Sequence, residues 1–213
     1  LPHIFKPQRR IDTNVVPGSE EKLDMLQYCV QTLTERGYVF IGMDHFAKPD
    51  DELSIALKEG FLQRNFQGYS TYADCDLVAI GVSSIGKIGS TYSQNERDID
   101  AYYAALDAGH LPIMRGYQLN QDDILRRNII QDLMCRFSLD YQIYESVFGI
   151  PFSRYFAAEL EDMKQLETLG LVRLKPHSLT VTPKGRFLIR NIAMVFDYHL
   201  RHKETKAKYS QTV

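Results

Sequence analysis

Two short, almost wholly apolar segments most strongly limit the folds open to this chain: residues 38–42 (YVFIG) and residues 76–82 (DLVAIGV). Strands that are apolar on both faces are typical of a parallel sheet covered by helices. Residues 49–59 lie between them and predict a short helix, so the order strand, helix, strand indicates βα units. A complete (β/α) barrel takes about 250 residues. The chain has 213 residues and few such strands, so we predict an α/β fold with only part of such a barrel or doubly wound domain.

A helix is predicted before the first of these segments. Ser19 is its expected N-cap, and Glu20 and Glu21 follow in the first turn, where the helix dipole favours acidic groups. Gly37 is the expected end of this helix. The apolar residues that recur at helical spacing are Leu23, Leu26, Val30 and Leu33.

The second half of the chain is predicted to be mainly helical. One helix follows Asn120, the expected N-cap, and another spans residues 153–169. The apolar face of the first consists of Leu125, Ile129 and Leu133.

A β-hairpin and a last helix complete the prediction. Residues 171–174 and 179–181 are the expected strands, and Thr182 and Pro183 begin the helix as N-cap and first helical residue. Helices followed by such a hairpin resemble a winged-helix module.

The charge differs between the two halves. Residues 1–112 carry 10 Lys and Arg against 16 Asp and Glu, a balance of −6, whereas residues 113–213 carry 15 against 11, a balance of +4. The turn-rich stretch 109–112 lies between them. We therefore predict two domains, 1–112 and 113–213.

The first candidate site follows the apolar segment 38–42. Asp44 and His45 stand where a buried strand would leave its sheet, which is where α/β folds bind ligands. If the strand stays extended, the two side chains point to opposite sides and do not act as a pair. The alternative is a strand end whose polar groups bind only backbone.

The second candidate site is the segment 64–69 (RNFQGY). Phe66 could stack on a nucleoside base, Gln67 could bind its edge, and Gly68 allows close approach of the backbone. A plain loop with an exposed aromatic ring is the structural alternative.

The third candidate site is the glycine-rich segment 80–86 (IGVSSIG). It is not G-x-G-x-x-G, and no P-loop Lys-Ser/Thr follows, so a phosphate cradle is not supported. Ile85 could serve as an apolar support for an adenine. A tight turn without a ligand is the alternative.

Other polar groups do not indicate a site. The basic residues of the last helix could bind nucleic acid, but acids interrupt them, so we favour a solvated face; they are Arg186, Arg190, Arg201 and Lys203. The three cysteines have no metal-site or C-x-x-C spacing; they are Cys29, Cys75 and Cys135. Asp74 and Asp76 disfavour a thiolate at Cys75, which argues against a nucleophile.

Four segments together resemble one family. These segments are residues 41–53 (IGMDHFAKPDDEL), 64–69 (RNFQGY), 81–86 (GVSSIG) and 185–192 (GRFLIRNI). They are similar to the oxygen-independent coproporphyrinogen III oxidases (coproporphyrinogen dehydrogenases) of the radical S-adenosylmethionine superfamily. The resemblance extends from Phe5 to the last helix. The haem-trafficking proteins of the superfamily lack the N-F-Q-G-Y form.

The resemblance implies radical chemistry in haem biosynthesis. The family cleaves S-adenosylmethionine at a four-iron–four-sulfur (4Fe-4S) cluster and decarboxylates two propionates of coproporphyrinogen III to the vinyl groups of protoporphyrinogen IX. By motif position, Ile85, Phe66 and Gln67 match its S-adenosylmethionine contacts. The helical C-terminal domain of the family covers the active site.

The sequence departs from the family in one respect. In the family a C-x-x-x-C-x-x-C run holds the cluster, and this run is absent from the sequence. The resemblance therefore implies the C-terminal portion of such an enzyme: the late βα units of a partial radical S-adenosylmethionine barrel, followed by the helical C-terminal domain. We expect this portion to be inactive alone, with no catalytic or metal-ligating residue of its own. A flavodoxin- or ferredoxin-type electron donor, a monomeric state and a cytoplasmic location are further expectations. The sequence has no run of about 18 apolar residues, so it predicts no membrane span. The alternative is a haem-handling or nucleic-acid-binding winged-helix module without catalysis.

Overall fold

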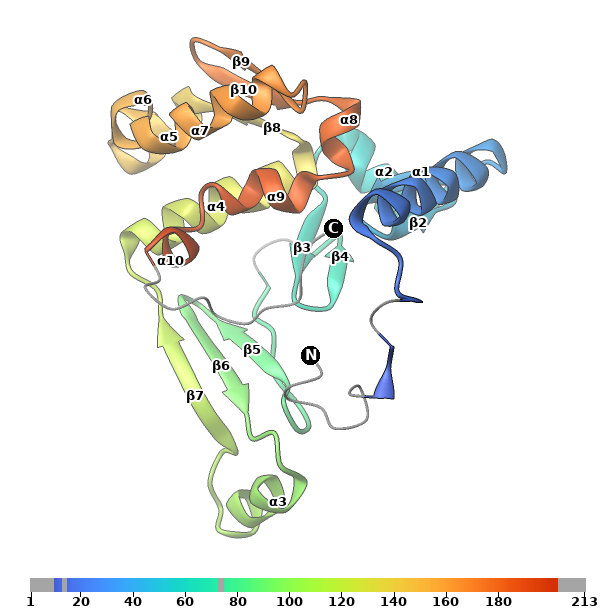
Figure 1. Cartoon of the computed structure of the whole chain (residues 1–213). Helices are drawn as coiled ribbons and strands as arrows, with labels where there is room; N and C mark the ends of the chain where they lie inside the picture. The colour runs from blue at the N-terminus through green and yellow to red at the C-terminus, as the bar shows by residue number, and fades with distance from the viewer. Residues whose placement is uncertain (1–9, 13–14, 73–74, 203–213) are drawn as a thin grey trace.

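A computed structural model describes residues 10–12, 15–72 and 75–202 (Figure 1). In these residues the strands form four small sheets. The helices are α1 (Ser19–Glu35), α2 (Glu52–Glu59), α3 (Ile99–Asp107), α4 (Gln121–Arg136), α5 (Tyr141–Phe148), α6 (Phe152–Tyr155), α7 (Ala157–Thr168), α8 (Pro183–Arg186), α9 (Ile189–Met194) and α10 (Tyr198–Arg201). The strands are β1 (Val39–Gly42), β2 (His45–Ala47), β3 (Gln63–Asn65), β4 (Gly68–Ser70), β5 (Ile85–Ile88), β6 (Thr91–Asn95), β7 (Ile113–Gln118), β8 (Ser138–Asp140), β9 (Val172–Lys175) and β10 (Ser178–Val181).

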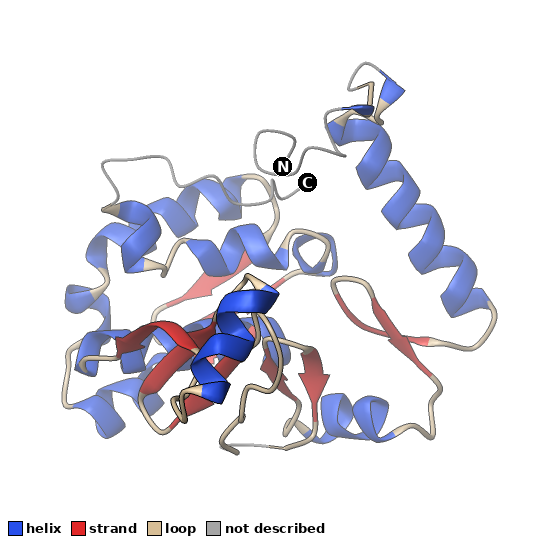
Figure 2. Ribbon diagram, turned by 90° about the horizontal axis from the view of Figure 1, so that it is seen from below, coloured by secondary structure: helices blue, strands red, loops and turns tan. Residues whose placement is uncertain are grey.

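Most of the elements belong to three groups in space (Figures 1 and 2). Helix α1 lies at the outside with the β1–β2 hairpin at its C-terminal end. Helices α4 to α10 form a helical layer together with the sheet β8–β10–β9. The sheet β5–β6–β7 extends away from that layer and carries α3 at its far end (Figure 1).

Helix α1 begins where the sequence predicts, but its cap differs. The N-cap is Gly18, which has no side chain to accept a hydrogen bond, and Ser19 is the first helical residue. The four predicted apolar residues of this helix are half-buried, and none is fully buried. The prediction of the helix is confirmed and that of the Ser19 cap is wrong.

The predicted parallel sheet is not found, because all strand pairs of the described residues are antiparallel. Met43 has a φ of +55°, and this left-handed residue turns the chain directly after β1. Strand β1 therefore returns as β2 and pairs with it, Val39 opposite Ala47. An apolar run indicates burial but does not fix the direction of the neighbouring strand.

The second apolar segment, residues 76–82, forms no strand of its own. Leu77 makes an isolated antiparallel bridge to Lys87, and the side chains of Val78 and Ile80 are 68% and 83% exposed. The prediction of a buried strand here is wrong. An apolar run this short is ambiguous, because its burial depends on what packs against it.

Helix α4 forms the centre of the helical layer, as the sequence predicts. Asn120 accepts a hydrogen bond from the backbone N–H of Asp123, and the Asp123 carboxylate accepts one from the N–H of Asn120, which completes a capping box. Leu125, Ile129 and Leu133 are buried in the core. Local capping chemistry and apolar spacing therefore locate this helix correctly.

The predicted helix 153–169 is two helices, α6 and α7, separated at Phe156. The Phe156 ring is fully buried, with ring centroids 4.8 Å from Phe152 and 5.5 Å from Phe196. The last predicted helix is also divided, into α8, α9 and α10, although Thr182 caps it as expected by accepting from the N–H of Gly185.

The hairpin of β9 and β10 is confirmed, and a third strand extends its sheet. Strand β8 pairs with β10, with Ser178 opposite Asp140, and its three residues gave no sequence signal. The winged-helix arrangement is not confirmed. Residue 112 lies between α3 and β7, and β7 pairs with β6, Tyr117 opposite Tyr92.

Gly185 provides a test of how closely α8 packs on the β9–β10 hairpin. A methyl group there would overlap the carbonyl oxygen of Leu171 and lie 2.9 Å from Cγ1 of Val181. Overpacking of this kind costs roughly 1–3 kcal/mol. We expect Gly185→Ala to lower the free energy of unfolding by about that amount in urea denaturation, and an unchanged free energy of unfolding would contradict this close packing.

Candidate functional site

Two adjoining cavities lie between the helical layer and the sheets. The first, called here the arginine cavity, has a volume of about 640 Å³ and includes Arg64, Arg127 and Arg190 in its wall. The second, the isoleucine cavity, has a volume of about 740 Å³ and is named for Ile85. Phe66, Tyr92 and Asp197 line both. Both volumes fall in the range of small-molecule sites, roughly 300–1,000 Å³.

Phe66 lies at the tip of the β3–β4 hairpin, in the wall shared by the cavities. The Asn65 side chain accepts a hydrogen bond from the N–H of Gln67 at 2.8 Å and closes the turn. Gly68 has a φ of +140°, and a Cβ there would lie 2.8 Å from Nε2 of His45, so this position requires glycine. The Phe66 ring is 56% exposed and meets Tyr92 edge-on at 5.3 Å, which leaves a ring face free for stacking.

The three predicted contacts are only partly brought together. Ile85 begins β5 opposite Gln94 and lines the isoleucine cavity together with Phe66. Gln67 follows Phe66 in the turn, but its side chain is exposed and is not part of either cavity wall. Phe66 and Ile85 thus line one cavity, Gln67 does not, and a contact of any of the three with S-adenosylmethionine remains a prediction.

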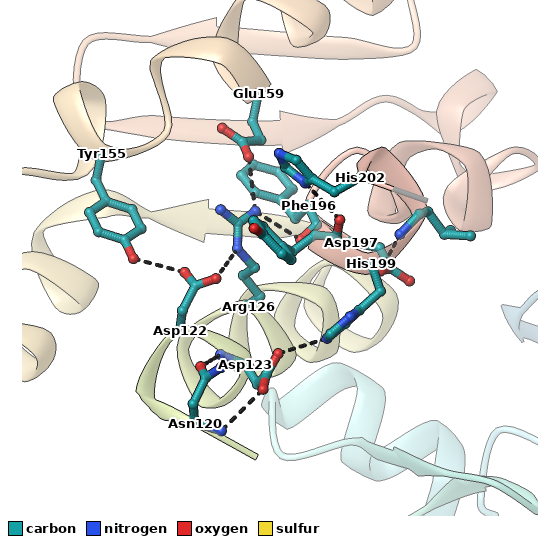
Figure 3. Close-up of polar contacts among 12 residues, drawn as sticks. Asn120, Asp122, Asp123, Arg126, Tyr155, Glu159, Phe196, Asp197, His199 and His202 are labelled. Atoms are coloured by element: carbon teal, nitrogen blue, oxygen red, sulfur yellow. Dashed lines mark hydrogen bonds and ion pairs between the residues drawn. The ribbon is translucent and has the colours of Figure 1, made fainter. Parts of the chain in front are cut away.

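An aspartate, a histidine and a tyrosine form a polar cluster beside the isoleucine cavity. Asp123 Oδ1 lies 2.9 Å from Nε2 of His199, and Tyr117 donates to Oδ2 at 2.9 Å. Tyr117 and His199 line the cavity, and Figure 3 shows the His199 contact at the start of α4.

The carboxyl of Asp123 has only 6% of its side chain exposed. Burial alone would raise its pKa, but hydrogen bonds from the Asn120 backbone, His199 and Tyr117 outweigh burial and lower it. The same hydrogen bond raises the pKa of Tyr117. The N-x-x-D pattern that predicts the cap could have indicated Asp123, but nothing in the sequence relates it to His199.

Asp44 and His45 do form a pair, contrary to the prediction for an extended strand. His45 Nδ1 lies 2.7 Å from Asp44 Oδ1, because the left-handed turn at Met43 reorients the chain. The His45 ring also meets the Tyr69 ring edge-on at 5.1 Å. This pair closes the β1–β2 turn and lines neither cavity.

The predicted solvated basic face is wrong for Arg186. Its guanidinium is partly buried, donates to the carbonyl of Phe40 at 2.9 Å, and lies 4.2 Å from the Phe137 ring centroid. Burial lowers its pKa. Arg201 pairs with Asp162, and Arg190 is exposed at the arginine cavity. Lys203 lies outside the described residues.

Within the described ranges, no group of three or more His, Cys, Asp or Glu residues is placed to hold a metal ion. Cys29 and Cys75 are exposed free thiols, and burial raises the pKa of Cys135 to about 12. These residues do not fit an iron–sulfur cluster. Within the same ranges, none of the helices has the length and apolar character that a membrane span requires.

Comparison with known proteins gives consistent matches. Residues 119–188 match the HemN C-terminal domain. The oxygen-independent coproporphyrinogen III oxidase of Synechocystis sp. is 46% identical over 217 residues, covering 100% of this chain and 47% of that protein. The protein of the same name from Escherichia coli is 46% identical over 213 residues, with 100% and 47% covered.

A solved structure also matches. It is described as coproporphyrinogen III oxidase (HemN) from Escherichia coli, a radical SAM enzyme, and it aligns with a TM-score of 0.88 and 47% identity over 94% of this chain and 46% of that chain. The chain therefore spans about half the length of the relatives it matches.

The Asp123 cluster predicts an acid-sensitive contribution to stability. Because the folded-state pKa lies below the unfolded one, the stabilisation is present above the unfolded pKa and is lost as pH falls through the folded pKa. Hydrogen bonds to a charged group contribute about 1.5–3 kcal/mol. We expect Asp123→Asn to destabilise the chain by roughly that amount at pH 7 in urea denaturation. The difference should shrink below pH ~4, and a pH-independent difference would contradict the assignment.

Proposed function

Because this chain belongs to the family of oxygen-independent coproporphyrinogen III oxidases, we propose that it is the part of such an enzyme that completes the S-adenosylmethionine site and covers it with a helical domain. The observation that carries the proposal is the 46% identity over the whole chain. Members of this family are named for acting on coproporphyrinogen III, which we propose as the substrate.

The proposed reaction converts two propionate side chains of coproporphyrinogen III to vinyl groups. Each propionate gives up one hydrogen atom to the group that S-adenosylmethionine supplies, releases one carbon dioxide, and passes one electron to a one-electron acceptor outside this chain. S-adenosylmethionine, when bound with a 4Fe-4S cluster, supplies the group that abstracts the hydrogen atom. The protein contributes placement of the reactants and exclusion of water.

The isoleucine cavity has the features that an adenosyl group requires. Phe66 presents a free aromatic face, Ile85 an apolar wall, and the cavity is large enough for a nucleoside. Gln67, next to Phe66, would bind the polar edge through its amide. In this proposal the three residues bind and orient S-adenosylmethionine, and none of them transfers a proton or an electron.

The cluster is proposed to be held by cysteines outside this sequence. The chain alone is then expected to be inactive, and we propose no step that its own cysteines perform. The two exposed free thiols are typical of a reducing compartment and support a cytoplasmic location. We further propose that the enzyme is a monomer and that it receives electrons from a flavodoxin- or ferredoxin-type donor. It is proposed to bind no nucleic acid.

The function is tested with the complete cluster-loaded enzyme that contains this segment, under anaerobic reducing conditions. We expect release of carbon dioxide and formation of protoporphyrinogen IX from coproporphyrinogen III. A cluster-loaded enzyme that leaves this substrate unchanged would overturn the proposal.

The cofactor contact is tested in the same enzyme with Phe66→Ala. Stacking of a base on an aromatic ring contributes about 1–3 kcal/mol, so affinity for S-adenosylmethionine should fall roughly 5- to 150-fold in equilibrium dialysis. Phe61→Ala is the matched control, because Phe61 is also an exposed ring but lines neither cavity. Gln67→Ala should weaken binding less, and unchanged affinity would remove Gln67 from the site.

A further inference from the structure

The arginine cavity concentrates positive charge in a chain whose net charge is negative. Four cationic residues line it against two acids, Asp76 and Asp197, a balance of +2, while the whole chain carries −2. The cations are Arg64, Lys87, Arg127 and Arg190.

The two acids are already engaged by backbone groups. Asp76 accepts a hydrogen bond from the N–H of Gly89 at 2.7 Å, and Asp197 accepts one from the N–H of Leu200 at 3.1 Å. The ion pairs found among the described residues include none of the four cavity cations. The lining residues therefore keep their balance of +2, and none of the four cations is held in an ion pair with a described residue.

Two of the guanidinium groups also contain buried donors without an acceptor. Nη1 of Arg64 and Nη1 of Arg127 are shielded from solvent and have no hydrogen-bond partner among the described residues. A buried charged donor without an acceptor is costly, and such groups in native proteins are normally satisfied. An anionic ligand with paired oxygens would satisfy them, since guanidinium groups bind carboxylates through two parallel hydrogen bonds.

Arg64 and Arg127 lie on two elements that contact each other. Arg64 lies on β3 with its guanidinium carbon 5.0 Å from the centre of the Tyr69 ring. Strand β3 is joined to α4 by a hydrogen bond from Gln131 to Gln63 at 3.0 Å, and α4 carries Arg127. The two groups therefore belong to elements in direct contact.

The rest of the wall is largely apolar. Helices α4 and α9 contribute Ile130, Met134, Ala193 and Met194, and Phe66 separates this cavity from the isoleucine cavity. A ligand that fits has an apolar body and carboxylate groups, and it would lie next to the proposed S-adenosylmethionine site.

We propose that the arginine cavity binds the carboxylates of the tetrapyrrole substrate through Arg64 and Arg127, with Arg190 at its exposed side. This proposal rests on the proposed function and adds which carboxylates are held: the two propionates that the product retains. An ion pair stabilises a carboxylate relative to neutral carbon dioxide, so it would oppose the reaction of any propionate it holds. The arginines would then act as substrate-binding and orienting residues rather than as catalytic ones.

The binding test uses the complete enzyme and coproporphyrin III, a stable oxidised probe with four carboxylates. We expect Arg127→Gln and Arg64→Gln each to weaken probe binding on the order of tenfold or more in a fluorescence titration. Arg127→Lys should recover only part of the loss, because an ammonium group lacks the planar pair of donors. Arg173→Gln is the matched control, with the same change of charge on the exposed face of β9.

Two further measurements separate binding from folding. Arg190→Gln changes an exposed side chain, so it should weaken binding of the probe even if the Arg64 and Arg127 variants fold poorly. The tetramethyl ester of the probe should bind the unsubstituted enzyme on the order of tenfold more weakly than the free acid. Equal binding of acid and ester, or unchanged binding in all three Gln variants, would overturn the proposal.

Steady-state kinetics test which propionates are held. Loss of a contact made equally in the ground and transition states raises KM and leaves kcat nearly unchanged, and this is the expected result for the Gln variants. A fall in kcat with unchanged KM would overturn the assignment to the retained propionates. If the unsubstituted enzyme binds the probe but does not turn over coproporphyrinogen III, the proposed function fails while carboxylate binding is still measured.

Discussion

A buried guanidinium at the centre of the helical layer fixes the arrangement on which both cavities depend. Arg126 of α4 is 9% exposed and pairs with Asp122 at 2.8 Å and with Glu159 of α7 at 2.9 Å (Figure 3). It also donates to the carbonyl of Phe196, between α9 and α10, at 3.2 Å. Burial lowers the pKa of Arg126, but these carboxylates outweigh it and raise the pKa. One side chain thus joins three helical segments, and removing one of its partners would leave a buried charge uncompensated.

The sequence is most informative where structure depends on neighbouring residues. The cap at Asn120, the cap at Thr182 and the β9–β10 hairpin are correct because each is determined within a few positions of the chain. Strand direction is different, since it depends on a single turn at Met43 and on what packs against the apolar segments. The break at Phe156 likewise follows from aromatic packing against distant Phe196, which no local pattern contains.

The candidate site shows the same division. Residue type and resemblance nominate Phe66 and Ile85, and the two line one cavity although 19 positions separate them. The contact between Asp123 and His199 joins residues 76 positions apart, and the buried donors of Arg64 and Arg127 are recognised only when their surroundings are known. Residue types are enough to suggest an aromatic and an aliphatic wall. Whether an arginine has an acceptor for its hydrogen bonds depends on the folded chain, so the sequence does not show it.

The hydrogen bond from Arg186 to the carbonyl of Phe40 affects how this protein can be dissected. The guanidinium belongs to α8 and its acceptor to β1, so a cut at residue 112 would leave a half-buried cation facing solvent where it now meets a carbonyl group and the ring of Phe40. The same cut would separate β6 from β7 and leave an unpaired strand edge, which promotes aggregation. Expression of the helical layer by itself would thus require new polar contacts around α8 and a different N-terminal boundary.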